Sequence, residues 1–488
     1  MNNYLKVISD EWKTEAANEK EEYFFNYDEV ESIINGEKLY IIGRKGTGKT
    51  CISEHINNIT EPDVFTEKLS FKDFPFRLLY EFQDRNYPAQ HRYITLWMQL
   101  IYMSVCKMLI KNQSIPDEIK NRLKKMYPYY MDGKLEDEIK RIKKFQLNIS
   151  GGAKGINGGI GGSVEKEIVE GGGWIDDVDV LQELIREHCD ESRYYIIFDQ
   201  LDEDYSGITE NDLKNNYLPL LTGLFKAVQK VRNLLKNFKI YPIVFLRDDI
   251  YERIKDSDKN KWDDILIRLV WDNQKLKKMV AHRLATSMGV ETSDFESLWR
   301  NIVDETCLQY PFGNRRTVWK HGRPVKERKQ IPLEEFFMKN SLMRPRDIVK
   351  FIVICCKTAL SRGKEKIFKD DIKESIVEYS HWFKREFDDE VQVVLPDMDV
   401  IWRILSDIKL QIFNKNDFYI AYGKYRSKLI HQDASFILEQ LFEFSIIGNQ
   451  DRANQTRFYF KYEHSDMKFN EDRPIVINTG LLKSLQIS

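Results

Sequence analysis

The sequence predicts an α/β fold in which a parallel sheet is flanked by helices. Three short apolar runs, Leu39–Ile42, Tyr194–Phe198 and Ile240–Leu246, have the length and composition of strands that are buried on both faces. Long helix-patterned stretches separate the runs, and strands that alternate with helices describe a doubly wound core. The first run leads directly into a glycine-rich octapeptide, Gly43–Thr50. The sheet is therefore expected to begin with a strand, a glycine-rich loop and a helix.

The octapeptide fits the phosphate-binding pattern G-x-x-x-x-G-K-[ST] at every fixed position. A segment able to form a helix, Thr50–Asn57, follows it, which is the context that the pattern requires. The glycines let backbone N–H groups turn toward phosphates, and the helix start adds partial positive charge. We expect Lys49 to reach the β- and γ-phosphates and Thr50 to place its hydroxyl on Mg²⁺. The predicted nucleotide-binding residues are Gly43, Arg44, Lys45, Gly46, Thr47, Gly48, Lys49, Thr50 and Cys51.

The composition describes a globular protein of two or three domains. Of the 488 residues, 42% are hydrophobic, and 75 Lys and Arg nearly balance 77 Asp and Glu, so no global basic field argues for nucleic acid or a membrane surface. The six cysteines form no C-x-x-C pair, and neither a zinc site nor a disulfide framework is expected. Met1–Lys20 lacks the apolar centre of a signal peptide, and no apolar run approaches the ~18 residues of a membrane span. We therefore expect a cytoplasmic, reduced protein without membrane contact.

The segments around the first strands are expected to be mostly helical. Met1–Glu22 is expected to be a helical or frayed lead-in, and Tyr23–Ile34 a short helix. Asp63–Phe71 alternates well enough to predict a second strand. Arg92–Lys111 is apolar on most sides and predicts a long buried helix, and charged, helix-patterned stretches continue over Asp117–Phe145.

A glycine-rich insertion at residues 149–173 interrupts the core. Ten of the chain's 24 glycines fall between Gly151 and Gly173, which excludes a helix there. Isoleucines and valines are spaced among the glycines, so the insertion is either a flexible hairpin or a loop that orders on assembly. We favour a mobile surface insertion over a functional element.

Two helices and a proline-containing strand are expected after the insertion. The pattern predicts a helix over Val178–Cys189 and a long helix with Pro219 in its first turn and its end near Phe238. Pro242 is expected near the start of the following strand, because inside the ladder it would remove a hydrogen bond.

The residues after the apolar run Tyr194–Phe198 carry the second part of the predicted site. A Mg²⁺–triphosphate needs a carboxylate at the end of a strand beside the phosphate loop, and Asp199 is the candidate. Hydrolysis further needs a group that orients or deprotonates the attacking water, a few residues beyond the metal carboxylate. Asp202 and Glu203 supply such groups.

Residues 196–203, Ile-Ile-Phe-Asp-Gln-Leu-Asp-Glu, look like the hhhhDxxDE form of the second nucleotide motif. This form resembles the STAND class of AAA+-related ATPases, especially its NACHT-like members and related bacterial P-loop ATPases found among defence proteins. The resemblance covers about residues 30 to 380. It implies a P-loop core with a helical lid, a winged-helix domain after the lid, ATP and Mg²⁺ as ligands, and a role in anti-phage defence.

The resemblance also points to three arginines. Arg247 follows the strand Ile240–Leu246 at the position of a sensor of the γ-phosphate. Arg344 and Arg346 flank Pro345, which opens a helix at the position of the family's lid helix, where either arginine would touch nucleotide. The alternative for Arg247 is a surface salt bridge with Asp248 or Asp249, and for Arg344 and Arg346 we favour the salt-bridge alternative.

Residues 414–417 spell the guanine-reading motif N-K-x-D, but we do not expect a GTPase. In a GTPase this motif ends a strand of the nucleotide domain, whereas here it falls after the lid region, between two helix-like segments. We therefore favour ATP over GTP and expect Asp417 to cap a helix.

A basic stretch, Gly313–Lys329, holds seven Arg or Lys residues against one acid, with Trp319 among them. It is expected to be a loop. It is either a solvated surface, a contact for a nucleic-acid backbone, or the source of an arginine that acts on a neighbouring subunit's nucleotide.

The C-terminal region predicts three helices, Met398–Leu410, Asn416–Tyr425 and Asp433–Phe444, followed by a two-stranded ribbon. This order suggests a winged helix. The third helix has no Arg or Lys and would be repelled by phosphates, so protein contact or packing on the core is favoured over DNA reading. The expected domains are a lead-in (1–30), an ATPase core (31–270), a lid (271–390) and a winged-helix domain (391–488).

Together these features predict an ATP-dependent molecular switch. ATP binding would drive assembly, as a homo-oligomer or with a separate sensor or effector protein, and slow hydrolysis by Glu203 or Asp202 would reset it. A first alternative is a nucleic-acid-binding ATPase of the origin-recognition type, with residues 313–329 and Arg457–Arg473 as contacts. A second alternative is a structural subunit in which nucleotide only stabilises the fold.

Overall fold

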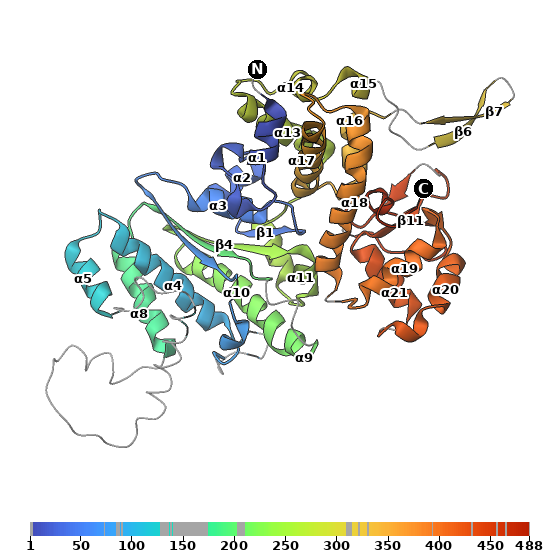
Figure 1. Cartoon of the computed structure of the whole chain (residues 1–488). Coiled ribbons are helices and arrows are strands. Elements are labelled where there is room, and N and C mark those ends of the chain that lie inside the picture. The colour runs from blue at the N-terminus through green and yellow to red at the C-terminus, as the bar shows by residue number, and fades with distance from the viewer. Residues whose placement is uncertain are drawn as a thin grey trace. The chain divides into compact units, whose positions relative to one another are not determined.

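The computed structural model describes residues 3–72, 74–83, 88, 91–126, 136, 139, 174–202, 210–308, 315–320, 323–328, 331–392, 394–430, 433–454, 457–463 and 466–487 (Figure 1). The predicted glycine-rich insertion lies outside the described residues. The chain forms two compact units. The sheet unit comprises Asn26–Arg44 and Lys49–Leu269, and the helical unit comprises Met1–Phe25, Lys45–Gly48 and Val270–Ser488.

A five-stranded parallel sheet, in the order β2-β3-β4-β1-β5, is the centre of the sheet unit. All four residues of β1 and six of the seven residues of β3 are buried, which explains why these strands appear in the sequence as continuous apolar runs. The predicted α/β class with a P-loop core is confirmed. The strands are β1 (Tyr40–Gly43), β2 (Val64–Ser70), β3 (Arg193–Asp199), β4 (Lys239–Arg247) and β5 (Leu266–Arg268).

Pro242 lies inside β4, opposite Ile196 of β3, without breaking the ladder. On the other side, β4 pairs with β1 only from Val244 onward, and the Val244 N–H donates to the Leu39 carbonyl at 2.8 Å. Alternate residues of a strand direct their N–H groups to the same side. The missing donor of Pro242 therefore points to the side where β1 has not yet begun, and no hydrogen bond is lost.

Helices cover both faces of this sheet. Figure 1 shows α3 on one side of the sheet and α4 with α10 on the other. The long predicted helix ends at Leu234, earlier than expected, because turns occupy residues 235–238. The helices of the sheet unit are α2 (Asp28–Ile34), α3 (Lys49–Asn57), α4 (Ile94–Lys111), α5 (Asp117–Met126), α8 (Trp174–His188), α9 (Glu210–Asp212), α10 (Leu218–Leu234), α11 (Asp248–Arg253) and α12 (Lys259–Trp262), with short turns η3 (Phe76–Leu78), η5 (Leu213–Tyr217) and η6 (Asp263–Ile265).

Helix α4 is long and apolar enough, by length and composition alone, to cross a membrane. In the structure 89% of this stretch is buried inside the protein, where it packs against α8 and α10. Its indole at Trp97 donates to the Leu220 carbonyl at 2.8 Å. The expected long buried helix is thus confirmed.

The N-terminal segment is an integral part of the helical unit. Helix α1 (Tyr4–Glu11) packs against α13 (Asn273–Met288) and α17 (Pro345–Ser361). Beyond α1, Glu19 forms a buried two-point ion pair with Arg283, with Nη2 to Oε2 at 2.6 Å. The predicted lead-in is therefore held by tertiary contacts, which a sequence pattern does not reveal. The short turns η1 (Ala16–Asn18) and η2 (Glu21–Tyr23) lie between α1 and the sheet unit's first residues.

Two further helices of this unit, α16 (Leu333–Lys339) and α18 (Lys369–Val391), pack against α17. Pro345 is the first residue of α17, as the sequence predicted, because its fixed φ suits a helix start. Aromatic side chains join the helices, with Phe351 of α17 stacked on Tyr379 of the next helix at 4.2 Å between ring centroids. The further elements are α14 (Phe295–Ile302) and α15 (Glu305–Leu308).

The basic stretch predicted to be a loop instead contains a two-stranded antiparallel ribbon, β6 (Arg315–Lys320) and β7 (Arg323–Arg328). The loop prediction was wrong because charged residues have low strand preference, and cross-strand pairing overrides that preference. The other residues of Gly313–Lys329 lie outside the described residues.

The C-terminal region is a winged helix with a larger sheet than predicted. Three helices, α19 (Met398–Ile408), α20 (Lys415–Gly423) and α21 (Ala434–Glu443), accompany an antiparallel sheet of order β10-β9-β11-β8. The expected two-stranded ribbon was therefore incomplete, because β8 and β9 are too short to show periodicity. The remaining elements are β8 (Ile412–Phe413), η7 (Arg426–Lys428), β9 (Ile447–Gln450), β10 (Phe458–Tyr459), β11 (Ile475–Ile477) and η8 (Thr479–Leu481).

The last residues of the winged helix pack closely against α18. A Cβ at Gly480 would lie 2.4 Å from the Asn340 carbonyl oxygen and 2.7 Å from the Phe383 ring, so only glycine allows this approach. The Ser484 N–H also donates to Ser380 Oγ at 2.9 Å. In α20, Asp417 accepts a hydrogen bond from the Asn414 N–H at 2.9 Å and closes the helix start, as expected of a cap.

Candidate functional site

Three strands of the sheet unit end at residues that the sequence predicted to belong to the site. Strand β1 ends at Gly43, β3 at Asp199 and β4 at Arg247. Because the strands are parallel and β4 lies between β1 and β3, the three ends share one edge of the sheet. The sequence predicted each residue separately, and the strand order brings them together.

The loop after β1 turns on two glycines with left-handed backbone angles. Gly46 has φ +81° and Gly48 has φ +97°, values that other residues rarely adopt. A Cβ at Gly48 would meet nothing within 4 Å, whereas a Cβ at Gly46 would lie 3.2 Å from the Cβ of Arg346. Both glycines are therefore required by the backbone, and Gly46 also by the space available.

Lys49 begins α3 and folds back on the start of the loop. Its Nζ donates to the carbonyl oxygens of Gly43 at 2.8 Å and of Arg44 at 3.0 Å. Burial lowers the pKa of Lys49, and the strongest opposing contribution comes from Asp202. An ammonium group held by two neutral carbonyls in a buried place is suited to an anionic ligand.

Asp199 is 2% exposed and has one carboxylate oxygen suited to a cation. Its Oδ1 accepts the Gln200 N–H at 2.9 Å, and its Oδ2 lies 3.0 Å from Nζ of Lys68 on β2. The Lys68 contact is short enough for an ion pair, but its angle does not suit a hydrogen bond. Within the described residues, Oδ2 therefore has no hydrogen-bond partner. A buried carboxylate oxygen of this kind fits the Mg²⁺ role predicted for Asp199.

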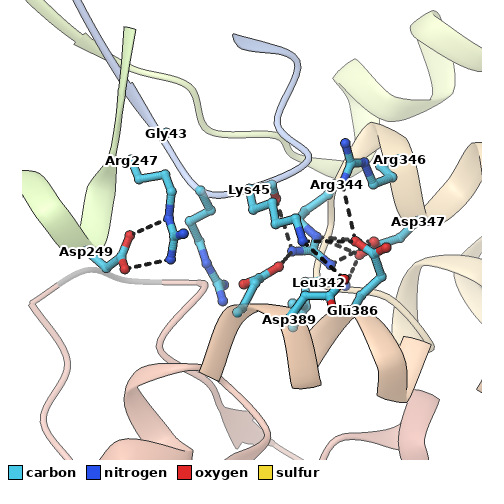
Figure 2. Close-up of polar contacts among 12 residues, drawn as sticks. Gly43, Lys45, Arg247, Asp249, Leu342, Arg344, Arg346, Asp347, Glu386 and Asp389 are labelled. Carbon is cyan, nitrogen blue, oxygen red and sulfur yellow. Dashed lines mark hydrogen bonds and ion pairs between the residues drawn. The ribbon is translucent and has the colours of Figure 1, made fainter. Parts of the chain in front are cut away.

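Arg247 is paired inside the sheet unit. Its Nε and Nη2 donate to the two carboxylate oxygens of Asp249 at 3.0 and 2.8 Å (Figure 2). Its Nε also lies 3.7 Å from Asp202 Oδ2. Asp248, the other partner considered, pairs with Arg268 of β5 instead. Arg247 is 9% exposed, so the ion pair exists but is buried rather than at the surface.

The remaining predicted residues of the sheet unit contribute less to this geometry. Thr50 and Cys51 follow Lys49 on α3 and are half-buried. Glu203 lies outside the described residues. No group of three or more His, Cys, Asp or Glu side chains suited to a metal occurs in the described part of the chain.

Arg344 forms a buried network in the helical unit. It is 2% exposed and donates to Asp347 through Nε and Nη2, at 3.0 and 2.9 Å to the closest oxygens, and to Glu390 Oε1 through Nη1 at 2.7 Å. The same Nη1 donates to the carbonyl oxygen of Lys45 at 3.0 Å (Figure 2). Burial acts to lower the pKa of Arg344, but Asp347 and Glu390 outweigh it and raise the pKa above its ordinary value.

Arg346 lies beside the loop with less buried partners. Its Nη1 donates to Glu386 of α18 at 3.2 Å, and its Nη2 lies 3.2 Å from Glu15 of the N-terminal segment. The Glu15 side chain is 63% exposed, so this contact exchanges easily with water. Both arginines are in salt bridges, as we favoured, but only Arg344 is fully enclosed by them.

Three contacts at the loop were missed by sequence reasoning. Trp271 Nε1 donates to the Thr47 carbonyl at 3.0 Å, and the Lys45 ammonium pairs with Asp389 at 3.7 Å and with Glu386 at 3.9 Å. A lone tryptophan carries no motif. The acidic residues of α18 recur at helical spacing, and that recurrence was the one available signal.

The comparisons with known proteins assign part of the chain. A family model described as the FunZ-associated C-terminal helical domain matches residues 305–388, from α15 into α18. No curated protein matches the chain significantly.

Several solved structures are similar to the chain. They include the Orc1 protein of Aeropyrum pernix in complex with DNA, at 9% identity and TM-score 0.36 over 94% of this chain and 90% of that chain. Cdc6p from Pyrobaculum aerophilum has 12% identity and TM-score 0.30 over 99% and 95%. The ORC2 protein of Aeropyrum pernix, in ADPNP and ADP complexes, has 11% identity and TM-score 0.43 over 96% of each chain. Identities and TM-scores this low assign no activity to the chain.

Proposed function

We propose that the protein is an ATP-binding and ATP-hydrolysing molecular switch. The observation that carries the proposal is the loop after β1, with its two left-handed glycines and Lys49, at the same sheet edge as the buried carboxylate of Asp199. Backbone N–H groups of such a loop and the start of α3 suit phosphates. In this proposal the ATPase core spans residues 31–270, the lid 271–390 and the winged helix 391–488.

The residues divide into binding and hydrolytic roles. Lys49 would hold the β- and γ-phosphates, and Thr50 and Asp199 would hold Mg²⁺, which neutralises phosphate charge when bound. Glu203 or Asp202 would orient and deprotonate the attacking water, and Arg247 would sense the γ-phosphate.

Of the two lid arginines, Arg346 is the better candidate for a nucleotide contact. Its Cβ adjoins Gly46 of the loop, and of its two carboxylate partners Glu15 is largely exposed and can be exchanged, while Glu386 also pairs with Lys45. Arg344 forms buried ion pairs with Asp347 and Glu390, so releasing it for a nucleotide contact would break two buried ion pairs.

The resemblance to STAND ATPases supports a switch that acts through assembly. The proposed partners are further copies of the chain or a separate sensor or effector protein, and the proposed setting is anti-phage defence. The winged helix favours a protein partner, because α21 contains no Arg or Lys.

Steady-state ATP turnover tests the proposal. The purified protein is expected to hydrolyse ATP slowly in the presence of Mg²⁺, and Glu203→Gln is expected to lower turnover by about 100-fold, as loss of a general base typically does. Asp202→Asn, measured in parallel, separates the two carboxylates. Equal turnover in the wild type and both variants would support the alternative of a structural nucleotide.

The ribbon β6–β7 favours a second candidate function, a nucleic-acid-binding ATPase. The ribbon is a separate two-stranded sheet, and its register places Arg315 opposite Arg328 and Lys320 opposite Arg323. A two-stranded ribbon is marginally stable by itself, and like charges in opposite positions destabilise it further. Arg316 lies opposite Glu327, so the like-charged pairs are the two at the ends of the ribbon, and a polyanion such as a nucleic-acid backbone would place negative charge against them.

Binding to linear duplex DNA at two salt concentrations decides between the candidates. If the ribbon contacts DNA, Arg315→Gln with Arg328→Gln is expected to weaken binding and reduce the slope of log affinity against log salt by about 2. Lys236→Gln with Lys239→Gln, the same charge change on exposed residues of the sheet unit, is the control. Duplex binding that is absent, or that both double variants lower equally, would reject the ribbon as a nucleic-acid site.

A further inference from the structure

We propose that Arg344 and Trp271 are positioning residues that hold the backbone of the phosphate-binding loop from the helical unit. The affinity for nucleotide would then be set by the position of the helices that carry them. This inference rests on the proposed ATP-binding function. Neither residue is part of the phosphate-binding pattern.

The backbone carbonyl groups of the phosphate-binding loop need hydrogen-bond donors. A loop that turns its N–H groups toward phosphates turns its carbonyl groups away, and buried carbonyls need donors elsewhere. The Lys45 carbonyl accepts from Arg344 Nη1 and the Thr47 carbonyl from Trp271 Nε1, each at 3.0 Å. Lys45–Gly48 accordingly belongs to the helical unit.

Arg344 is a rigid donor. Its guanidinium is held by Asp347 of α17 and Glu390 of α18, and Asp347 Oδ2 also accepts the Leu342 N–H at 2.9 Å. Because two carboxylates determine the orientation of the guanidinium, and one of them is itself held by the Leu342 N–H, the N–H that meets Lys45 has a set direction. A lysine cannot reproduce this fork.

Trp271 holds the loop at a second point, from the residue that precedes the cap of α13. It lies one residue after the helical unit resumes at Val270 and one residue before Asp272, which caps α13 by accepting the Lys275 N–H at 2.8 Å. Its indole has one donor, and that donor is used on the loop. The loop is thus held at Lys45 from α17 and α18, and at Thr47 from the start of α13.

The consequence is a coupling between helix position and phosphate binding. A shift of α13, α17 or α18 moves the two carbonyls and with them the adjoining N–H groups. Ligand binding that requires one loop position favours one helix arrangement in return.

The test is Trp271→Phe, with Trp299→Phe as the matched control. Both changes remove one indole N–H from a buried ring of the helical unit, but Trp299 Nε1 has no hydrogen-bond partner in the described part of the chain. Trp271→Phe is expected to raise the Kd for a fluorescent ATP analogue about fivefold to tenfold, the effect of one lost hydrogen bond to a buried acceptor. The turnover at saturating ATP should change less than twofold, and Trp299→Phe should leave the Kd unchanged.

A second readout needs no nucleotide. Hydrogen exchange of the amides of residues 45–48, measured without ligand, should be faster in Trp271→Phe than in the wild type and unchanged in Trp299→Phe. Unchanged exchange and unchanged Kd in Trp271→Phe would overturn the inference. If the amides exchange faster in Trp271→Phe but the wild-type protein binds no ATP, both the proposed function and the coupling to nucleotide would be rejected. The two residues would then only hold the loop in place.

Discussion

Replacing Lys49 with alanine is expected to abolish ATP turnover while the protein stays folded. Among the residues that the structure describes, Lys49 Nζ donates to two neutral carbonyl oxygens, and burial lowers its pKa, so its removal costs the fold little. In the variant, the β- and γ-phosphates of bound ATP would lose the ammonium group proposed to hold them. Turnover should fall by about 100-fold or more, the range for loss of one donor to a developing charge.

The measurement is steady-state turnover together with binding of a fluorescent ATP analogue, with circular dichroism as the check on folding. Lys38→Ala is the control, because the exposed Lys38 ammonium donates to the Asp264 carbonyl at 2.9 Å and lies outside the octapeptide. Turnover that survives in Lys49→Ala and disappears in Lys38→Ala would contradict the assignment of the loop.

The second large effect concerns stability. Arg344→Met is expected to destabilise the protein by about 3–5 kcal/mol, because it removes the buried arginine that pairs with the buried carboxylates of Asp347 and Glu390. Arg346→Met, two residues away, should cost at most about 1 kcal/mol, because its partner Glu15 is largely exposed and its other partner, Glu386, also pairs with Lys45. The two substitutions remove the same group from the same helix start.

Urea unfolding followed by circular dichroism compares the two variants. Since a chain of two units need not unfold in one step, the midpoints of the transitions are the quantities to compare. Arg344→Met should show a clearly lower midpoint than the wild type, and Arg346→Met a nearly unchanged one. Equal midpoints in the two variants would show that the Arg344 network does not stabilise the fold.

The core of the fold was accessible from the sequence because its signals are local. The apolar runs before Gly43, Asp199 and Arg247 have the composition of strands covered on both faces, and each run became a parallel strand. Pro345 opens α17 as predicted, since its φ is preset for a helix start. The octapeptide carries its own backbone requirement in Gly46 and Gly48.

Errors arose where pairing between distant segments overrides local preference. The ribbon β6–β7 was expected to be a loop, and its two strands are specified by their pairing with each other rather than by local preference. In the C-terminal sheet, β8 and β9 are held by pairing with β11, and short segments of this kind show no periodicity. The N-terminal segment was expected to be a helical or frayed lead-in, and it does contain α1, but the burial of Glu19 against Arg283 has no local signal.

The sequence by itself determined that the chain carries a phosphate-binding loop after a buried strand, because spacing and glycine content specify that loop without reference to the rest of the fold. It also determined which carboxylates and arginines are candidates. Tertiary structure decided that β4 lies between β1 and β3, that Arg344 is committed to Asp347 and Glu390, and that Trp271 holds the Thr47 carbonyl. These contacts join residues far apart in the chain, and no local pattern encodes such distances.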